Sequence, residues 1–349
     1  MARKCTFKNI FVKPNEQRLS LLRLCHGEKM SVFIPMIKTI VSTALPADEH
    51  FFIRKNVLSH GKGKQRLCIV TGTHGDELEG QLVAYQIAKR INENIGQLDG
   101  TVEIYPALNP LGIDTLKRGI PNFDLDMNRI FPGMPDGTMA EQTAFCIIND
   151  LKGADLVIDI HSSNLYLRET PQVRINVNDE NRLVPIAEKM HIDFVWVHDA
   201  ATVLEATLAH SLNSTGTPCL VAEMGVGMRV NNKMCSRLTD GIFNLMHSMG
   251  MWSEKPDTSV LADTIVCKGD SVDFLNADSS GVFLTEKHTG TYVTKGECIG
   301  QIVSPMEGRV LSEVISPSDG FLFTIRAYPI VYEGSLMARI FRTPVPVEG

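Results

Sequence analysis

The stretch RLCIVTGTHGDELEG, from Arg66 to Gly80, decides the fold of this 349-residue chain. Its first half is a short apolar run rich in residues that favour β-strands, and a helical pattern from Leu78 to Asn94 follows the glycine-containing turn. A buried strand that passes through such a turn into a helix is the repeating unit of α/β proteins. The stretch therefore predicts an α/β domain with a polar corner between strand and helix.

The same alternation of strand and helix patterns continues as far as residue 249. Strands are predicted at 101–108, 156–160, 194–197 and 218–224, and helices at 139–151, 179–191, 202–212 and 234–249. Because these strands are almost continuously apolar, we expect helices to cover the sheet on both faces. The first ~60 residues give no clear pattern, and for them we expect short strands that lead into the core.

The pattern changes near residues 252–257. Beyond this point short apolar runs alternate with glycine-containing turns, and helical periodicity is nearly absent. We therefore predict two domains, an α/β domain of residues 1–255 and a smaller all-β domain, a barrel or sandwich, of residues 256–349.

Composition and charge exclude several classes of protein. Hydrophobic residues make up 44% of the chain and charged residues 21%, which is typical of a globular protein. The net charge is -6 and no basic stripe is present, so we expect no nucleic-acid partner. No apolar run approaches the ~18 to 20 residues that a bilayer requires, so we expect no membrane partner.

The N-terminus and the cysteines predict a cytoplasmic location. The start, Met1–Cys5, is basic, but no apolar segment follows it as in a signal peptide. The eight cysteines stand singly, without a CxxC pair, as expected of reduced thiols. The sequence leaves the oligomeric state open, and a homo-oligomer is compatible with it.

The turn after the first strand carries two candidate metal ligands. His74 and Glu77 lie three residues apart where strand becomes helix, a spacing that lets an imidazole and a carboxylate converge on one point. Zinc takes such nitrogen and oxygen ligands at about 2.0 to 2.2 Å. The alternative is a glycine-rich turn with a chance histidine and an acidic residue that favours the helix N-terminus. Taken alone, the turn supports both interpretations.

Two further strands end in polar residues. His161 is placed where a third ligand would be needed, and Asp159 leaves the strand on the same side, where it can accept the second N–H of a ligating histidine. Glu223 is suited to act as general base beside a metal. Each residue has a simpler reading, as a polar strand terminus or part of an ordinary salt bridge. The candidate ligands and Glu223 all lie at the carboxyl end of a predicted strand, where sites in open α/β sheets form. Their shared position therefore favours one metal centre.

A long polar connection between residues 108 and 133 carries Arg118 and Arg129. Long loops of this kind are often functional. The two arginines could supply fixed positive charge, one for a developing oxyanion and one for a substrate carboxylate. Taken singly, either arginine is better interpreted as a surface residue.

Four motifs together resemble a known family. GTHGDE at 72–77, DMNRIFPG at 126–133, DIHSS at 159–163 and AEMG at 222–225 occur in the order found in the succinylglutamate desuccinylase/aspartoacylase family of the zinc carboxypeptidase superfamily. The resemblance covers roughly Arg66 to Gly250. It implies a carboxypeptidase-like α/β fold, with a mixed sheet flanked by helices.

The resemblance also implies roles for seven residues. One zinc ion per chain would be bound by His74, Glu77 and His161. Glu223 would be the general base and acid. The residues that would contact the substrate are Asn128 and Arg129, which would hold its carboxylate, and Arg118, which would polarise the scissile carbonyl.

The C-terminal region is similar to the barrel-sandwich fold of biotinyl and lipoyl carriers. Its turns at 294–300 and 304–310 carry the resemblance, but Met306 and Glu307 stand where the carriers have their modified lysine. We therefore interpret this region as a structural or substrate-gating cap. Tyr292 and Tyr328 are its candidates to reach the site.

The leading functional hypothesis is a zinc amidohydrolase that removes the acyl group from an N-acylated amino acid or similar small amide. A first alternative is a peptidase that trims a C-terminal residue or a peptide cross-link with the same metal site, and the stretch 165–175 would then decide whether a short peptide can enter. A second alternative is a non-catalytic metal- or ligand-binding module whose β domain engages a partner. The intact predicted ligands and Glu223 count against that module.

Overall fold

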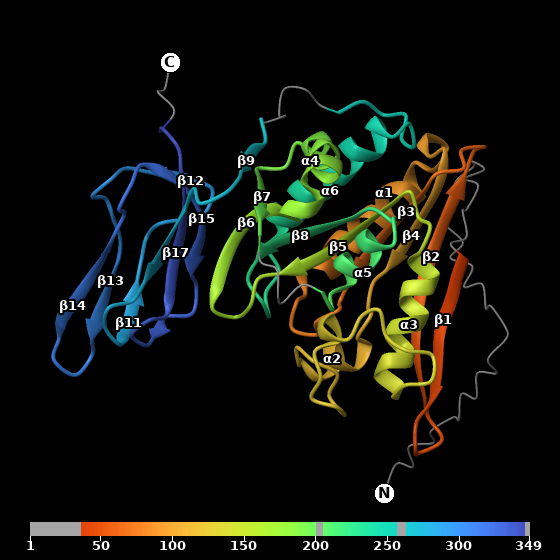
Figure 1. Ribbon diagram of the computed structural model, residues 1–349, viewed down its shortest axis with the longest axis horizontal. Coiled ribbons are helices and arrows are strands. Elements are labelled where there is room, and N and C mark those ends of the chain that lie inside the picture. Colours follow the sequence, from red (N-terminus) through yellow and green to blue (C-terminus); the bar gives the residue numbers. More distant parts are fainter. Residues whose placement is uncertain (1–35, 200–204, 257–262, 346–349) are drawn as a thin grey trace, which may run out of the picture. The chain divides into compact units, whose positions relative to one another are not determined.

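The computed structural model describes residues 36–199, 205–256 and 263–345 (Figure 1). Cys5, Cys25 and the first part of the helix predicted at 202–212 lie outside these ranges. All described residues belong to one compact unit of the chain.

The centre of the sheet consists of four parallel strands. In spatial order they are β4 (Gly100–Tyr105), β3 (Arg66–Thr71), β5 (Leu156–Ser162) and β8 (Cys219–Gly225). Every residue of β5 is buried, and β3 is buried apart from its first residue. Burial on both faces explains the continuous apolar runs in the sequence, and the four strands predicted there are confirmed.

Antiparallel strands extend this centre on both sides and make the sheet mixed, as predicted. On one side β2 (His50–His60) pairs with β4, and β1 (Met36–Ala44) pairs with β2. On the other side β6 (Leu167–Asn176) runs antiparallel to β8 and parallel to β7 (Phe194–His198). The strands of the N-terminal part are thus longer than the short ones we expected.

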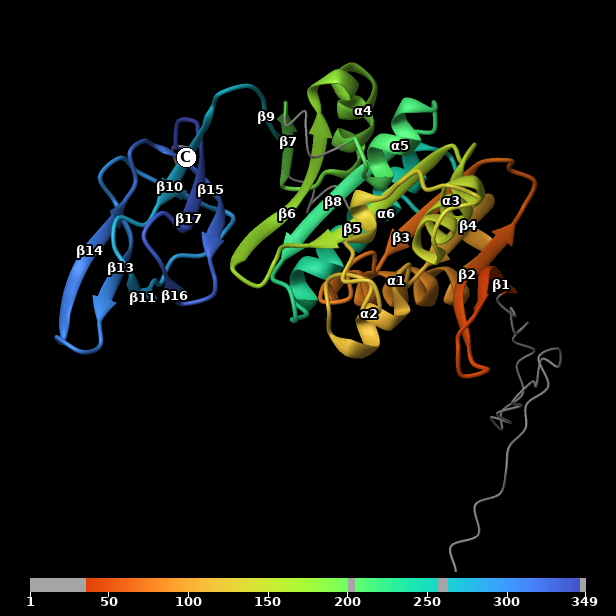
Figure 2. The same cartoon turned by 60° about the horizontal axis from the view of Figure 1, so that its bottom comes forward.

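Helices cover the sheet on both faces. Figure 2 shows α1 on one side of the central strands and α3 and α5 on the other. The α-helices are α1 (Glu79–Glu93), α2 (Pro110–Thr115), α3 (Met139–Leu151), α4 (Glu180–Ala187), α5 (Leu208–Ser214) and α6 (Asn232–Ser248). Single 3-10 turns are η1 (Ile95–Gln97), η2 (Met127–Arg129), η3 (Val177–Asp179) and η4 (Glu188–Met190).

Helix α5 begins later than predicted, because Thr207 has an extended backbone and its side chain caps the helix by accepting from the N–H of His210. The start of α3 is fixed in the same way by a capping box between Thr138 and Glu141. Helix α2 lies in the connection that we expected to be irregular.

The face of the sheet under α3 and α5 carries the functional strand ends. Val157 of β5 and Cys219 of β8 lie in the core that these helices cover. Side chains alternate between the two faces of a strand, so His161 and Glu223 point to this same face. The two residues are also direct partners in the pairing of β5 with β8.

The C-terminal region is all-β, as predicted, and consists of two sheets that pack on a shared core. Residues of both sheets, such as Ile302 and Leu322, belong to that core. One sheet has the order β14–β13–β11–β16, and strands β15, β17, β10, β12 and β9 join the large sheet. The strands are β9 (Ile265–Cys267), β10 (Val272–Asn276), β11 (Gly281–Leu284), β12 (Thr291–Val293), β13 (Cys298–Ser304), β14 (Arg309–Ile315), β15 (Gly320–Arg326), β16 (Ile330–Val331) and β17 (Leu336–Arg342).

This region continues the large sheet through two pairings. Strand β15 pairs with the start of β6, where Thr324 lies opposite Glu169. Strand β9 pairs with β7. The domain boundary near residue 255 stays a prediction.

Two further findings concern the residues that the structure describes. Their six cysteines are free. No helix among them has both the length and the apolar character needed to cross a membrane.

Candidate metal centre and active-site cavity

The turn between β3 and α1 brings the first two predicted ligands into contact. Nδ1 of His74 lies 2.6 Å from Oε1 of Glu77. Gly72 has a φ of +67°, a conformation that glycine adopts readily. The turn passes so close to α2 that a Cβ at Gly75 would lie 2.0 Å from the carbonyl carbon of Gly112. The glycines therefore allow the turn to pack closely against α2.

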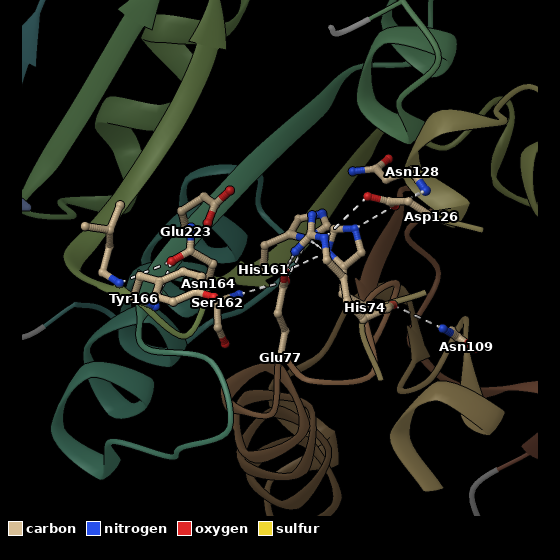
Figure 3. A network of polar contacts seen from close by, with 12 residues as sticks. His74, Glu77, Asn109, Asp126, Asn128, His161, Ser162, Asn164, Tyr166 and Glu223 are labelled. Carbon is tan, nitrogen blue, oxygen red and sulfur yellow. Dashed lines mark hydrogen bonds and ion pairs between the residues drawn. The ribbon is translucent and has the colours of Figure 1, made fainter. Parts of the chain in front are cut away.

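His161 completes a cluster of three buried side chains (Figure 3). Its Nδ1 lies 2.9 Å from Oε2 of Glu77 and 3.3 Å from Nδ1 of His74. Two ligands bound to tetrahedral zinc at 2.0 to 2.2 Å lie about 3.3 to 3.6 Å apart. The three groups therefore converge closely enough to hold one metal ion.

The other nitrogen of each imidazole contacts a carboxylate. Nε2 of His161 lies 3.0 Å from Oδ2 of Asp159, the contact that the strand pattern predicted. Nε2 of His74 lies 2.9 Å from Oδ1 of Asp126. Such outer carboxylates orient ligating histidines, and here they leave both Nδ1 atoms facing Glu77. Asp126 was not predicted, because it lies in the long connection, where sequence gives no side-chain direction.

The charges at this cluster favour a cation. Burial would lower the pKa of His161, but the carboxylates of Asp159 and Glu77 raise it well above its usual value. The pKa of His74 is likewise raised, by Glu77 and Asp126, against the effect of burial. Burial would raise the pKa of Glu77, but the two imidazoles hold it well below its usual range.

Arg118 reaches the cluster from the long connection. Its Nη1 donates to Oε1 of Glu77 over 2.8 Å, and its Nε lies 3.4 Å from Oδ2 of Asp126. The side chain is 42% exposed, so the guanidinium forms part of the rim of the centre. When both imidazoles are neutral, as metal ligands are, three carboxylates (Glu77, Asp126 and Asp159) face one arginine, which leaves net negative charge for a cation.

A cavity of about 430 Å³ opens beside the cluster. This volume lies in the range of small-molecule sites. The seven site residues predicted from the sequence all line it: His74, Glu77, Arg118, Asn128, Arg129, His161 and Glu223.

Asn128 and Arg129 lie in η2 at the edge of this cavity. Oδ1 of Asn128 accepts from the N–H of Leu208 over 2.9 Å, which fixes the side chain against the start of α5. Its amide N–H groups are the donors that remain for a ligand. Arg129 is exposed and donates to the carbonyl oxygen of Asn128 over 2.8 Å.

Glu223 faces the same cavity from the end of β8. Its side chain is 16% exposed, and Oε1 accepts from Nη1 of Arg174 over 3.3 Å. Burial raises the pKa of Glu223 to about 6, against the opposing charge of Arg174. Arg174 stands in the stretch whose structure the sequence did not predict.

The C-terminal region reaches the cavity through a residue that the sequence did not single out. Arg339 of β17 lies in the cavity wall. Tyr292 and Tyr328, the two candidates from the sequence, do not line the cavity. Tyr292 packs edge-on against Phe321, and Tyr328 against Tyr166. The sequence around Arg339 is mostly apolar and gives no indication that this residue lines the cavity.

Comparisons with known proteins identify the family of the chain. The family model described as the succinylglutamate desuccinylase/aspartoacylase catalytic domain matches residues 63–249. The chain is 23% identical over 265 residues to an N-alpha-acetyl-L-2,4-diaminobutyric acid deacetylase from Halomonas elongata, a match that covers 72% of this chain and 76% of that protein.

Solved structures share the fold. The structure of the ectoine utilization protein EutE (DoeB) from Ruegeria pomeroyi superposes with a TM-score of 0.74 at 19% identity, covering 90% of this chain and 98% of that one. A succinylglutamate desuccinylase/aspartoacylase from Rhodobacter sphaeroides gives a TM-score of 0.72 at 23% identity, with the same coverage of 90% and 98%. Because the matching family model spans more than half of the chain, the protein belongs to the succinylglutamate desuccinylase/aspartoacylase family, an enzyme family of deacylases.

Proposed function

We propose that the protein is a zinc-dependent hydrolase that cleaves the amide bond of N-acylated amino acids or similar small amides. The observation that carries this proposal is the convergence of His74, Glu77 and His161 beside a cavity that also contains Glu223. The Halomonas elongata relative, named as a deacetylase of an N-acetylated amino acid, supports the substrate class.

The residues at the cluster fit zinc. Two imidazole nitrogens and a carboxylate are a common catalytic ligand set for this ion, and Asp126 and Asp159 supply the usual outer partners of the histidines. His74, Glu77 and His161 would hold one ion per chain. When bound, zinc supplies Lewis-acid chemistry, since it lowers the pKa of water towards ~7 and polarises a carbonyl group.

Glu223 carries the proton transfers in this proposal. Its carboxylate accepts a proton from the attacking water and returns it to the nitrogen of the leaving amine. Its pKa, raised to about 6 by burial, supports both steps, because the group is charged near neutral pH and still basic enough to take up a proton. Arg174 favours the charged form that accepts the first proton.

The cationic and amide groups at the rim orient the substrate. Arg118, held by Glu77, donates to the oxyanion that develops on the scissile carbonyl oxygen. The amide of Asn128 and the guanidinium of Arg129 bind the substrate's carboxylate. The cavity of about 430 Å³ has the size of a small-molecule site and can accommodate an N-acyl amino acid.

The test is a hydrolysis screen of the zinc-loaded protein against N-acetyl amino acids, N-succinyl amino acids and dipeptides. We expect release of the amino acid from an N-acyl substrate, loss of this activity with a chelator and its return with added zinc. Faster cleavage of dipeptides than of every N-acyl amino acid would favour the peptidase. No hydrolysis of any of them by fully loaded protein would contradict the proposal.

A further inference from the structure

Four charged side chains of alternating sign connect β17 to Glu223. Nη1 of Arg339 donates to Oε1 of Glu169 over 2.9 Å. Nη2 of Arg174 donates to Oε2 of the same carboxylate, and its Nη1 donates to Oε1 of Glu223 over 3.3 Å. All four residues line the cavity, although Glu169 and Arg174 belong to β6, Glu223 to β8 and Arg339 to the C-terminal region.

Neighbouring side chains hold both arginines in place. The guanidinium carbons of Arg174 and Arg339 lie 5.5 and 5.4 Å from the ring centroid of Trp196. Arg339 also lies 5.6 Å from the ring centroid of Phe274. Gln172 donates to Oε2 of Glu169 over 3.0 Å. Cation–π contacts and this hydrogen bond therefore restrict the orientation of Arg174, Arg339 and Glu169.

Burial makes each of these charges depend on its neighbours. The side chain of Glu169 is 2% exposed, and both of its oxygens are engaged by an arginine. A buried charge that loses one partner draws more strongly on those that remain, because water cannot replace the lost contact. Without Arg339, Glu169 would depend on Arg174. We then expect Arg174 to lose its contact with Glu223, which is longer than its contact with Glu169.

We propose that Arg339, Glu169 and Arg174 are positioning residues that fix the carboxylate of Glu223 for proton transfer, so that the C-terminal β region takes part in the reaction. The inference rests on the proposed function, in which Glu223 is the general base and acid. In this proposal the C-terminal region acts on the group that transfers the proton. A cap, in contrast, would act on substrate entry alone.

Arg339→Met tests the proposal, with Arg342→Met as its matched control. Arg342 lies on the same strand and also binds a carboxylate, that of Asp273, over 2.8 Å, but it is 47% exposed and does not line the cavity. We expect Arg339→Met to lower kcat by about 10- to 100-fold, the usual scale for an outer partner, with KM within about twofold. Arg342→Met should leave both constants unchanged.

Two outcomes would overturn the proposal. If Arg339→Met loses no more activity than Arg342→Met, Arg339 does not act on Glu223. If KM rises while kcat is kept, Arg339 binds substrate directly. Arg339→Lys keeps a donor that can reach Glu169, so its kcat should lie closer to that of the wild type than the kcat of Arg339→Met does. In a Glu223→Gln background, Arg339→Met should reduce the residual kcat no further.

A double-mutant cycle on stability tests the connection without any activity. The free energy of urea unfolding is measured for the wild type, Arg339→Met, Glu223→Gln and the double variant. We expect non-additive effects that vanish when Glu169→Gln is also present, because the coupling passes through Glu169. Additive changes in the free energy of unfolding would overturn the inference, whether or not the protein is active. An inactive wild type with non-additive effects would overturn the proposed function and leave the connection between the residues standing.

Discussion

At the residue scale, Glu223 stands apart from the proposed metal ligands because its carboxylate accepts a hydrogen bond from Arg174. Glu223→Gln keeps the shape of the side chain but removes the group that takes up a proton. We expect one zinc ion per chain to be retained and kcat to fall by about 10²- to 10⁴-fold. Metal analysis and steady-state kinetics on the same preparation check this, and full activity would contradict the assignment.

His198 in the cavity wall predicts how stability depends on pH. Burial and the charge of Arg174 lower its pKa to about 4, below the ordinary value of 6.5. The unfolded chain therefore binds a proton that the folded protein does not, and stability is lost as the pH falls from 6.5 towards 4.

His198→Gln should remove this loss. Relative to the wild type, the variant should gain on the order of 1 to 2 kcal/mol of unfolding free energy when the pH is lowered from about 7 to about 5. Urea titrations at both pH values measure the difference. A difference that does not change with pH would show that His198 is not held neutral in the folded protein.

Four of the seven site residues that the sequence predicted share one property. His74, Glu77, His161 and Glu223 follow apolar strands, and the ends of parallel strands meet at one edge of a sheet, so their proximity could be inferred. Asp126, Arg174 and Arg339 could not be found in this way. Their direction depends on the path of a long connection or on which distant strand lies alongside.

At the scale of elements, the turn of residues 72–78 must pack tightly on α2 to present His74 and Glu77, the two proposed ligands. In Gly75→Ala, the new Cβ would lie 2.0 Å from the carbonyl carbon of Gly112, so one backbone segment must move. We expect a loss of about 1 to 3 kcal/mol of stability, together with weaker zinc binding.

Gly96→Ala is the matched control, since a Cβ there meets nothing within 4 Å. It should change stability by less than about 0.5 kcal/mol. Urea unfolding and zinc titration of the two variants check both expectations. Wild-type zinc affinity in Gly75→Ala would show that the turn tolerates a shift away from α2.

Strand β6 shows why some elements could not be predicted. Arg168, Glu169 and Arg174 interrupt its apolar pattern, and such charges usually mark exposed segments. Glu169 is in fact buried and Arg174 is half-buried, because the two side chains satisfy one another. The ion pairs of Glu169 with Arg174 and with Arg339 of β17 depend on the tertiary structure, which hydrophobic periodicity does not reveal.

At the scale of the whole molecule, an ion at the proposed metal site would link two separate segments of the chain. His74 and Glu77 follow β3, and His161 ends β5, so a bound ion holds two strands and the start of α1 together. An ion that binds the folded protein and not the unfolded chain stabilises it in proportion to the logarithm of its concentration.

Zinc should therefore raise the thermal midpoint of the metal-free protein by several degrees, and a chelator should reverse the change. His161→Ala, which lacks one ligand, should show a much smaller shift. Differential scanning calorimetry measures all three samples. Equal shifts in the wild type and the variant would place the stabilising ion elsewhere.

The proposed function requires that His74, Glu77 and His161 hold one zinc ion on which amide hydrolysis depends. Its most direct test is the titration of metal-free protein with zinc, in which bound metal and turnover of an N-acyl amino acid found by the screen are measured in the same samples. We expect turnover to rise with bound zinc and to level off at one ion per chain. Turnover that is already complete in metal-free protein, or absent when one ion is bound, would contradict it.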